Sequence, residues 1–206
     1  MKPVIDYSIY LVTDRHCLKG RDFFTCIEEA LRGGTTLVQL REKQISESDF
    51  IAIGKKLHAL CASYGVPLII NDNITVARKV QAAGVHLGQD DGCLQAARNL
   101  LGPDAIIGIS AHNIMEARLA QEQGADYLGV GAVYPTGSKS DAREIGLEKL
   151  QKVVESVTIP CVGIGGIGLE QYKAVRQTGT KGCAMISAIL GSDNIKATVE
   201  SLKKLC

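Results

Sequence analysis

Short apolar runs alternate with longer amphipathic stretches from one end of the chain to the other. The apolar runs contain many β-branched residues and are bounded by glycine, proline and polar residues, which is typical of buried strands. Each run is followed by a stretch with helical periodicity. The eight runs are SIYLVT, TLVQLR, VPLIIN, GVHLG, AIIGIS, DYLGVGAV, PCVGIGG and GCAMIS.

The intervening stretches predict helices, and two of them carry boundary signals. Ser46 is followed three residues later by Asp49, a variant of the capping box, and Gly65 suits the end of the same helix. Asn113 and Gly124 bound a second amphipathic stretch in the same way. Across the chain we expect helices that begin near Phe23, Ser46, Ile74, Leu94, Ile114, Leu147, Leu169 and Asn194.

Eight strand–helix units in one chain predict an α/β fold, the single-domain (β/α)8 TIM barrel. The chain has 206 residues, fewer than the roughly 250 that are typical of this barrel, so its connections must be tight. No linker divides it, and we expect one domain over residues 1–206. An open, doubly wound sheet is the alternative. The choice matters because chemistry in a barrel lies at the carboxyl ends of the strands.

Composition narrows the class of partner. Apolar residues make up 46% and charged residues 22% of the chain, as in an ordinary globular protein. The net charge is +1, and six Tyr and three Phe without Trp make a poor surface for stacking bases. These numbers argue against nucleic-acid binding and against a polybasic membrane-binding patch. A homo-oligomer is compatible with the sequence, which does not define its state.

The cysteines and the N-terminus favour the cytoplasm. Seven cysteines give an odd count without a C-x-x-C pair, so a zinc or redox motif has no support. Free thiols suit a reducing compartment. The opening MKPVIDYSIYLVTD lacks the features of a signal peptide, and no apolar run approaches the roughly 18 residues of a membrane span.

Long polar side chains follow the second predicted strand, in QLREK. Gln39, Arg41 and Lys43 alternate along the chain and share one face where the backbone stays extended. A solvated strand end is one interpretation of this pattern. The functional alternative is an anion clamp, in which Arg41 grips a phosphate with its planar fork and Lys43 adds a point charge.

Acidic side chains follow the third and fourth predicted strands. In IINDN, Asn71 and Asp72 come directly after the apolar run, and Asn73 suits the cap of the next helix. In GVHLGQDDG, Asp90 and Asp91 form either a simple turn or part of a cation site. Two carboxylates from neighbouring strand ends repel each other unless a cation bridges them, and Mg²⁺ takes one or two carboxylates together with substrate phosphates.

Phosphate-binding signals gather after the last strands. GIGGIG matches G-x-G-x-x-G at Gly163, Gly165 and Gly168, but no acidic residue follows about 20 positions on, so a dinucleotide fold has weak support. Barrels often build phosphate sites from the loops after strands seven and eight, and Ser187 ends the eighth run. Ser110, after the fifth run, is weaker evidence because a serine also caps helices.

Seven motifs in order resemble the thiamin phosphate synthase family over nearly the whole chain, from YLVTD to MISAI. They are VQLREK, IINDN, GVHLGQDD, GISAH, VYPTGSK, GIGGI and ISAI. The resemblance implies a (β/α)8 barrel transferase of thiamin biosynthesis with Mg²⁺ as cofactor. In this family a pyrimidine diphosphate is joined to a thiazole phosphate, and pyrophosphate is released.

The same resemblance implies roles for the matching residues. The catalytic residues would be Arg41, Lys43, Ser110 and Lys139, and the metal ligands would be Asp72 and Asp91. The substrates would be bound by Gln39, Leu40, Arg41, Glu42, Lys43, Asn71, Ser110, Thr136, Gly137, Ser138, Lys139, Gly166, Ile186 and Ser187. Asp90 stands where the family usually has Glu, and the metal position is the second acid.

One departure lies in the loop after the sixth predicted strand. The family usually reads Thr-Pro-Thr-Lys where this chain reads TGSK, and Gly137 loosens the loop before a substrate binds. The chemistry otherwise agrees with the residues, because an aminopyrimidine can stabilise a carbocation after the diphosphate leaves. The attacking thiazole nitrogen has no proton to lose, so no general base is needed. His86 and His112 are therefore interpreted as structural residues.

Three alternatives stay open at this point. Thiazole tautomerases share the barrel and the phosphate loops but tend to lack the full set of diphosphate and metal residues. Another phosphate-substrate isomerase or lyase would need an acid or base at a strand end, for which Asp14 is the spare candidate. A noncatalytic sensor would need the pocket but not the metal.

Overall fold

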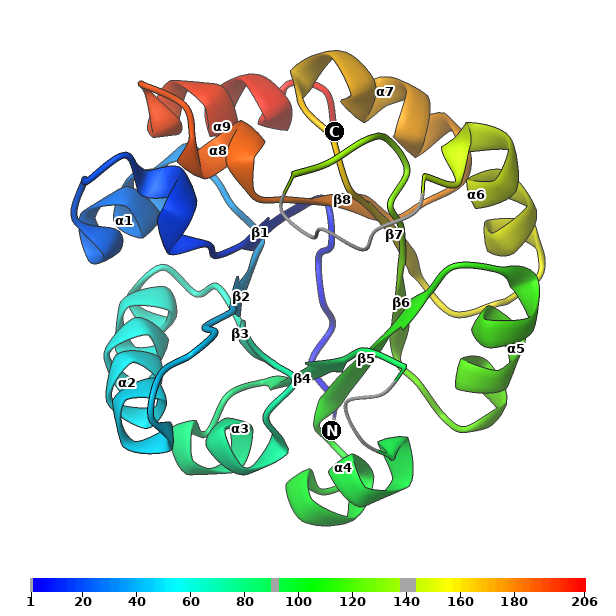
Figure 1. Cartoon of the computed structure of the whole chain (residues 1–206), viewed down its shortest axis with the longest axis horizontal. Coiled ribbons are helices and arrows are strands. Elements are labelled where there is room, and N and C mark those ends of the chain that lie inside the picture. The colour runs from blue at the N-terminus through cyan, green and yellow to red at the C-terminus, as the bar shows by residue number, and fades with distance from the viewer. Residues whose placement is uncertain (1, 90–92, 138–143) are drawn as a thin grey trace.

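The computed structural model describes residues 2–89, 93–137 and 144–206. These residues form a closed barrel of eight parallel strands, β1 to β8 in chain order, with helices around the outside (Figure 1). The strand β8 closes the barrel on β1, where Ala184 and Tyr10 are Cα partners. The predicted (β/α)8 fold is confirmed, and the open-sheet alternative is wrong.

The observed elements follow the predicted order. The strands are β1 (Ile9–Val12), β2 (Leu37–Leu40), β3 (Leu68–Asn71), β4 (Gly84–Leu87), β5 (Ile106–Ala111), β6 (Tyr127–Gly131), β7 (Cys161–Ile164) and β8 (Gly182–Met185). The helices are η1 (Arg15–Leu18), α1 (Phe23–Gly33), α2 (Glu47–Ser63), α3 (Ile74–Val80), α4 (Leu94–Leu101), α5 (Ile114–Glu122), α6 (Gly146–Glu155), α7 (Leu169–Gln177), α8 (Ser187–Leu190) and α9 (Ile195–Lys203). Within the described ranges, none of them combines the length and apolarity that crossing a membrane requires.

Side-chain caps explain several of the helix starts. Ser46, Asn73 and Asn113 each accept a hydrogen bond from the backbone N–H three residues ahead, at 2.9 to 3.1 Å. Ser110 lies inside β5, so it does not cap the following helix. The polar residues at the ends of the strands are therefore not needed as caps of these helices and can serve another role.

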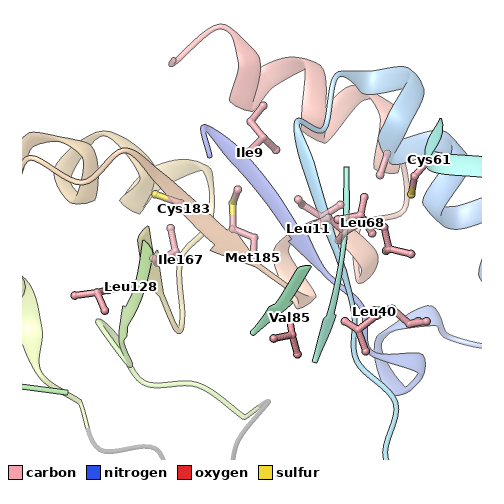
Figure 2. Packing of buried hydrophobic residues seen from close by; sticks show 14 of the residues in the cluster. Ile9, Leu11, Leu40, Cys61, Leu68, Val85, Leu128, Ile167, Cys183 and Met185 are labelled. Atoms are coloured by element: carbon pink, nitrogen blue, oxygen red, sulfur yellow. The ribbon is translucent and has the colours of Figure 1, made fainter. Parts of the chain in front are cut away.

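The apolar core has two parts. The larger part lies between the barrel and the surrounding helices and includes Leu11 and Leu68 (Figure 2). The smaller part fills the interior of the barrel and includes the aromatic rings of Tyr10 and Tyr127. Gly108 leaves the space that the ring of Tyr127 occupies, because a Cβ atom on this residue would lie only 2.1 Å from Cζ of Tyr127. Small residues on one strand thus make room for a ring from its neighbour.

Candidate active site

A cavity of about 770 Å³ opens at the carboxyl end of the barrel. Its wall is built from the ends of the strands and from the loops that follow them, where the sequence pattern predicts the chemistry. Among the residues that line it are Gln39, Arg41, Lys43, Asn71, Asp72, Ser110, Thr136, Gly166, Ile186 and Ser187. The fold therefore brings most of the predicted site residues to one place.

Three other predicted residues have different surroundings. Leu40 is fully buried in the core between barrel and helices, because it alternates with Gln39 and faces the opposite side of β2. The carboxylate of Glu42 accepts hydrogen bonds from Nε of Arg15 at 2.8 and 3.1 Å. Gly137 lies next to Thr136 but is not among the residues that line the cavity. Asp91, Ser138 and Lys139 lie outside the described residues.

Two basic side chains at the cavity are paired with carboxylates. Nη1 of Arg41 donates to Oδ2 of Asp14 at 3.1 Å, and Nζ of Lys43 donates to Oδ2 of Asp72 at 2.9 Å. Oδ1 of Asp14 accepts from the backbone N–H of His16 at 2.9 Å. Both oxygens of Asp14 are therefore engaged, which leaves this carboxylate poorly suited to act as a general base.

Asp72 has carboxylate oxygens of the kind that coordinate a divalent cation. It lines the cavity, and its Oδ1 accepts a hydrogen bond from the Asn71 side-chain amide, while Oδ2 accepts from Lys43. Within residues 2–89, 93–137 and 144–206, no three His, Cys, Asp or Glu side chains gather closely enough to hold a metal. Asp91 lies outside that part of the chain, so the predicted pair of magnesium ligands stays a prediction.

The glycine-rich loop after β7 lies directly against the loop after β6. Gly165 and Gly166 have φ values of 98° and 63°, a conformation that favours glycine. A Cβ atom on Gly166 would lie 2.5 Å from the carbonyl oxygen of Pro135. Strands β7 and β8 pair with each other, and Ile186 and Ser187 follow β8 into the same cavity. Glycine backbone and a serine side chain thus line the cavity where the sequence predicts a phosphate site.

His86, interpreted from the sequence as structural, also lines the cavity. Its Nε2 lies 3.1 Å from Oγ of Ser110, and its Nδ1 lies 2.9 Å from Oη of Tyr127. On another strand, Nε2 of Gln39 lies 2.6 Å from Oη of Tyr10. Burial raises the pKa of both tyrosines well above the usual phenol value, so both hydroxyls keep their protons. The sequence signal that could have placed this histidine at the cavity is the alternation in GVHLG. It puts the ring on one face of the strand, between two glycines.

Comparison with known sequences points to one family. Residues 9–189 match the thiamine monophosphate synthase family. A thiamine-phosphate synthase from Clostridium acetobutylicum is 53% identical over 192 residues, which cover 93% of this chain and 91% of that protein. Another, from Alkaliphilus oremlandii, is 48% identical over 199 residues, which cover 97% of this chain and 95% of that protein.

Solved structures agree with the sequence comparison. A thiamine phosphate pyrophosphorylase from Pyrococcus furiosus is 41% identical and has a TM-score of 0.90, covering 97% of this chain and 95% of that chain. A thiamine phosphate pyrophosphorylase from Bacteroides thetaiotaomicron is 14% identical with a TM-score of 0.68, and this likeness shows the barrel fold alone. The family match and the relatives at about half identity over nearly the full length show that this chain belongs to the thiamine monophosphate synthase family.

Proposed function

We propose that this chain joins 4-amino-5-hydroxymethyl-2-methylpyrimidine diphosphate to hydroxyethylthiazole phosphate, giving thiamin phosphate and pyrophosphate. The observation that carries the proposal is a single cavity with two kinds of anion-binding feature. Arg41 and Lys43 follow β2, and the backbone around Gly166 follows β7. Two phosphorylated substrates require two such places. The curated synthases that are similar over nearly the whole chain support the same reaction.

The residues divide by the chemistry of their side chains. Arg41, Lys43 and Lys139 would bind the diphosphate, because a guanidinium fork and ammonium groups complement its oxygens. Gln39, Asn71 and Ser110 would bind the pyrimidine ring. The thiazole phosphate would be bound by Thr136, Ser138, Gly166, Ile186 and Ser187.

Catalysis in this proposal is electrostatic. The bond between the pyrimidine CH₂ and the diphosphate oxygen breaks, and its electron pair leaves with the diphosphate. Arg41, Lys43 and Lys139 stabilise the charge that develops on this leaving group. Mg²⁺, held by Asp72 and Asp91, would supply further charge neutralisation when bound. The exocyclic amino group of the pyrimidine donates electrons to the resulting cation, which makes a dissociative path accessible.

The second half of the reaction needs no proton transfer. The lone pair of the thiazole nitrogen forms the new C–N bond, and this nitrogen carries no proton. The engaged carboxylate of Asp14 is consistent with this chemistry, whereas an isomerase or lyase requires an available acid or base. We also propose that residues 1–206 act as one domain in the cytoplasm, where the seven free cysteines would stay reduced.

The deciding experiment is turnover by the purified chain. Formation of thiamin phosphate and pyrophosphate is measured with both substrates and Mg²⁺, with each of the three omitted in turn. We expect product only when both substrates are present, and a strong rise in rate with Mg²⁺. Interconversion of thiazole phosphate isomers without the pyrimidine would instead identify a tautomerase. Binding of either phosphate without turnover would identify a sensor.

A further inference from the structure

A continuous chain of side-chain hydrogen bonds runs through the barrel interior. It begins at Gln39 and passes through Tyr10, Tyr127 and His86 to Ser110, with donor–acceptor distances of 2.6, 2.8, 2.9 and 3.1 Å. The two tyrosines are 1% and 0% exposed, and each of their hydroxyl groups has two partners within the chain of hydrogen bonds. Both ends of the chain line the cavity, although they lie on strands β2 and β5.

The hydrogen bonds of this chain have one direction. Nε2 of Gln39 can only donate, so Oη of Tyr10 accepts from it. The buried proton of Tyr10 then has Tyr127 as its acceptor among the described residues, and Tyr127 in turn donates to Nδ1 of His86. A neutral imidazole whose Nδ1 accepts carries its proton on Nε2, which donates to Oγ of Ser110.

The opposite direction leaves a buried group unsatisfied. If His86 donated from Nδ1 to Tyr127, the hydroxyl of Tyr127 would point back to Tyr10. The hydroxyl of Tyr10 already accepts from Gln39, and its own buried proton would then lack an acceptor among the described residues. A buried donor without an acceptor destabilises the fold, so the direction from Gln39 to Ser110 is favoured.

The direction fixes what each end offers to a ligand. Gln39 uses one of its two N–H groups on Tyr10, which fixes the orientation of its amide, and its carbonyl oxygen is the acceptor that it offers to a ligand. Ser110 accepts from His86, so its hydroxyl proton remains a donor toward the cavity. The chain therefore fixes the orientation of the Gln39 amide and leaves the Ser110 hydroxyl proton for a ligand, although each side chain alone can donate or accept.

We propose that Tyr10, Tyr127 and His86 are positioning residues that fix Gln39 as an acceptor and Ser110 as a donor, so that the site selects an aminopyrimidine over a pyrimidinone. This inference rests on the proposed function, which supplies the pyrimidine ring. An aminopyrimidine presents an N–H group and ring nitrogens that accept. In the corresponding pyrimidinone a carbonyl replaces the amino group and a ring nitrogen carries the proton, so both contacts are mismatched.

The test compares the binding of two diphosphates to wild type and Tyr127→Phe. The ligands are the aminopyrimidine diphosphate and its 4-oxo analogue, and their dissociation constants are measured by calorimetry without the thiazole substrate, so that reactivity does not enter. We expect the wild type to prefer the amino compound. In Tyr127→Phe the proton that fixes the His86 tautomer is lost, and we expect the preference to fall about tenfold, corresponding to roughly 1.4 kcal/mol.

A matched control separates selection from general destabilisation. Tyr172 is also fully buried, and its hydroxyl donates to the backbone oxygen of Ser8 at 3.0 Å, away from the residues that line the cavity. Tyr172→Phe removes a comparable buried hydroxyl and should keep the preference of the wild type. Equal preferences in wild type and Tyr127→Phe overturn the inference alone. Failure of the wild type to make thiamin phosphate overturns the proposed function and this inference with it.

Nitrogen NMR gives a second readout that does not depend on ligand. With ¹⁵N-labelled histidine, the ring of His86 should carry its proton on Nε2 in the wild type and in Tyr172→Phe, and its signal is assigned by its loss in His86→Gln. In Tyr127→Phe we expect a mixture of the two neutral tautomers. A wild-type ring protonated on Nδ1 would contradict the direction of the chain.

Discussion

Nη1 of Arg41 lies 3.1 Å from Oδ2 of Asp14, and this ion pair holds a guanidinium at the wall of the cavity. The two side chains are 22% and 10% exposed, so the pair is better shielded from solvent than a typical surface ion pair. A guanidinium has further N–H donors beyond the one that Asp14 engages. Asp14 can therefore orient Arg41 while other donors of the same group bind a phosphate.

Arg41→Ala should raise the KM for the pyrimidine diphosphate by about tenfold to a hundredfold, because hydrogen bonds to charged groups contribute roughly 1.5–3 kcal/mol. Steady-state kinetics at saturating thiazole phosphate measure this change. Asp14→Asn should give a smaller rise, since the guanidinium is retained but less firmly oriented. Arg32→Ala is the control, because Arg32 is exposed on α1 and pairs with Glu28. Unchanged kinetics in a folded Arg41→Ala variant would show that this residue does not bind the diphosphate.

Gly166→Ala should raise the KM for the thiazole phosphate and leave that for the pyrimidine diphosphate nearly unchanged. The new Cβ atom would meet the carbonyl oxygen of Pro135 at 2.5 Å, so the loops after β6 and β7 must separate. Gly65→Ala is the matched control, because Gly65 has a similar φ of 68° but no heavy atom within 4 Å of the added Cβ. Kinetics for each substrate and thermal unfolding of both variants check the prediction. Equal loss for both substrates in Gly166→Ala would indicate misfolding.

The unfolding free energy should fall as pH rises above about 9, because buried thiols resist ionisation. Burial raises the pKa of Cys61 and Cys183 to about 12 and that of Cys161 to about 11, from an ordinary value of 9.0. The unfolded thiols ionise first, so stability is complete below their ordinary pKa and is lost as pH rises toward the folded values. Each thiol should cost about 1.4 kcal/mol between pH 8 and pH 10.

Urea unfolding at these two pH values tests the thiol prediction. Cys61→Ala should show a smaller loss of unfolding free energy between pH 8 and pH 10 than the wild type. Cys93→Ala is the control, because Cys93 is exposed at the start of α4, and its pH dependence should match the wild type. The same loss in all three proteins would assign the alkaline effect to other groups.

The fold was predictable because local patterns and topology agree. Alternating strand and helix patterns fixed the order of the elements, and caps such as Ser46 and Asn113 fixed several boundaries. A closed parallel barrel then gathers the strand ends, so residues as distant as Arg41 and Ser187 could be assigned to one site. The single turns η1 and α8 were not predicted, because four residues are too few to show helical periodicity.

The interior polar chain was harder to predict, because it depends on contacts between strands. Tyr127 and His86 are 41 residues apart in the sequence, and their hydrogen bond depends on the register of neighbouring strands and on the space that Gly108 leaves. Leu40 shows the converse limit. The family resemblance assigns a continuous run of residues at the end of β2 to the substrate site. Because side chains alternate along β2, however, Leu40 packs in the larger part of the core, between the barrel and the helices.

The last prediction concerns the two adjacent aspartates after β4. We predict that Asp91, not Asp90, binds magnesium together with Asp72, whose carboxylate lines the cavity and lies 2.9 Å from Nζ of Lys43. Asp91→Asn should lower turnover by roughly tenfold or more, which corresponds to about 1.4 kcal/mol of transition-state stabilisation, and should raise the magnesium concentration needed for half-maximal activity.

Magnesium titrations of activity in Asp90→Asn and Asp91→Asn decide between the two residues. Asp90→Asn removes the same charge one position away, so a general electrostatic effect would appear in both variants, whereas a ligand effect should appear in Asp91→Asn alone. Asp72→Asn should shift the magnesium requirement in the same direction as Asp91→Asn, because both carboxylates would contact one cation. A shift in Asp90→Asn alone would reverse the assignment. If neither variant shifts it, the two aspartates form only a turn, since Asp and Gly are common turn residues.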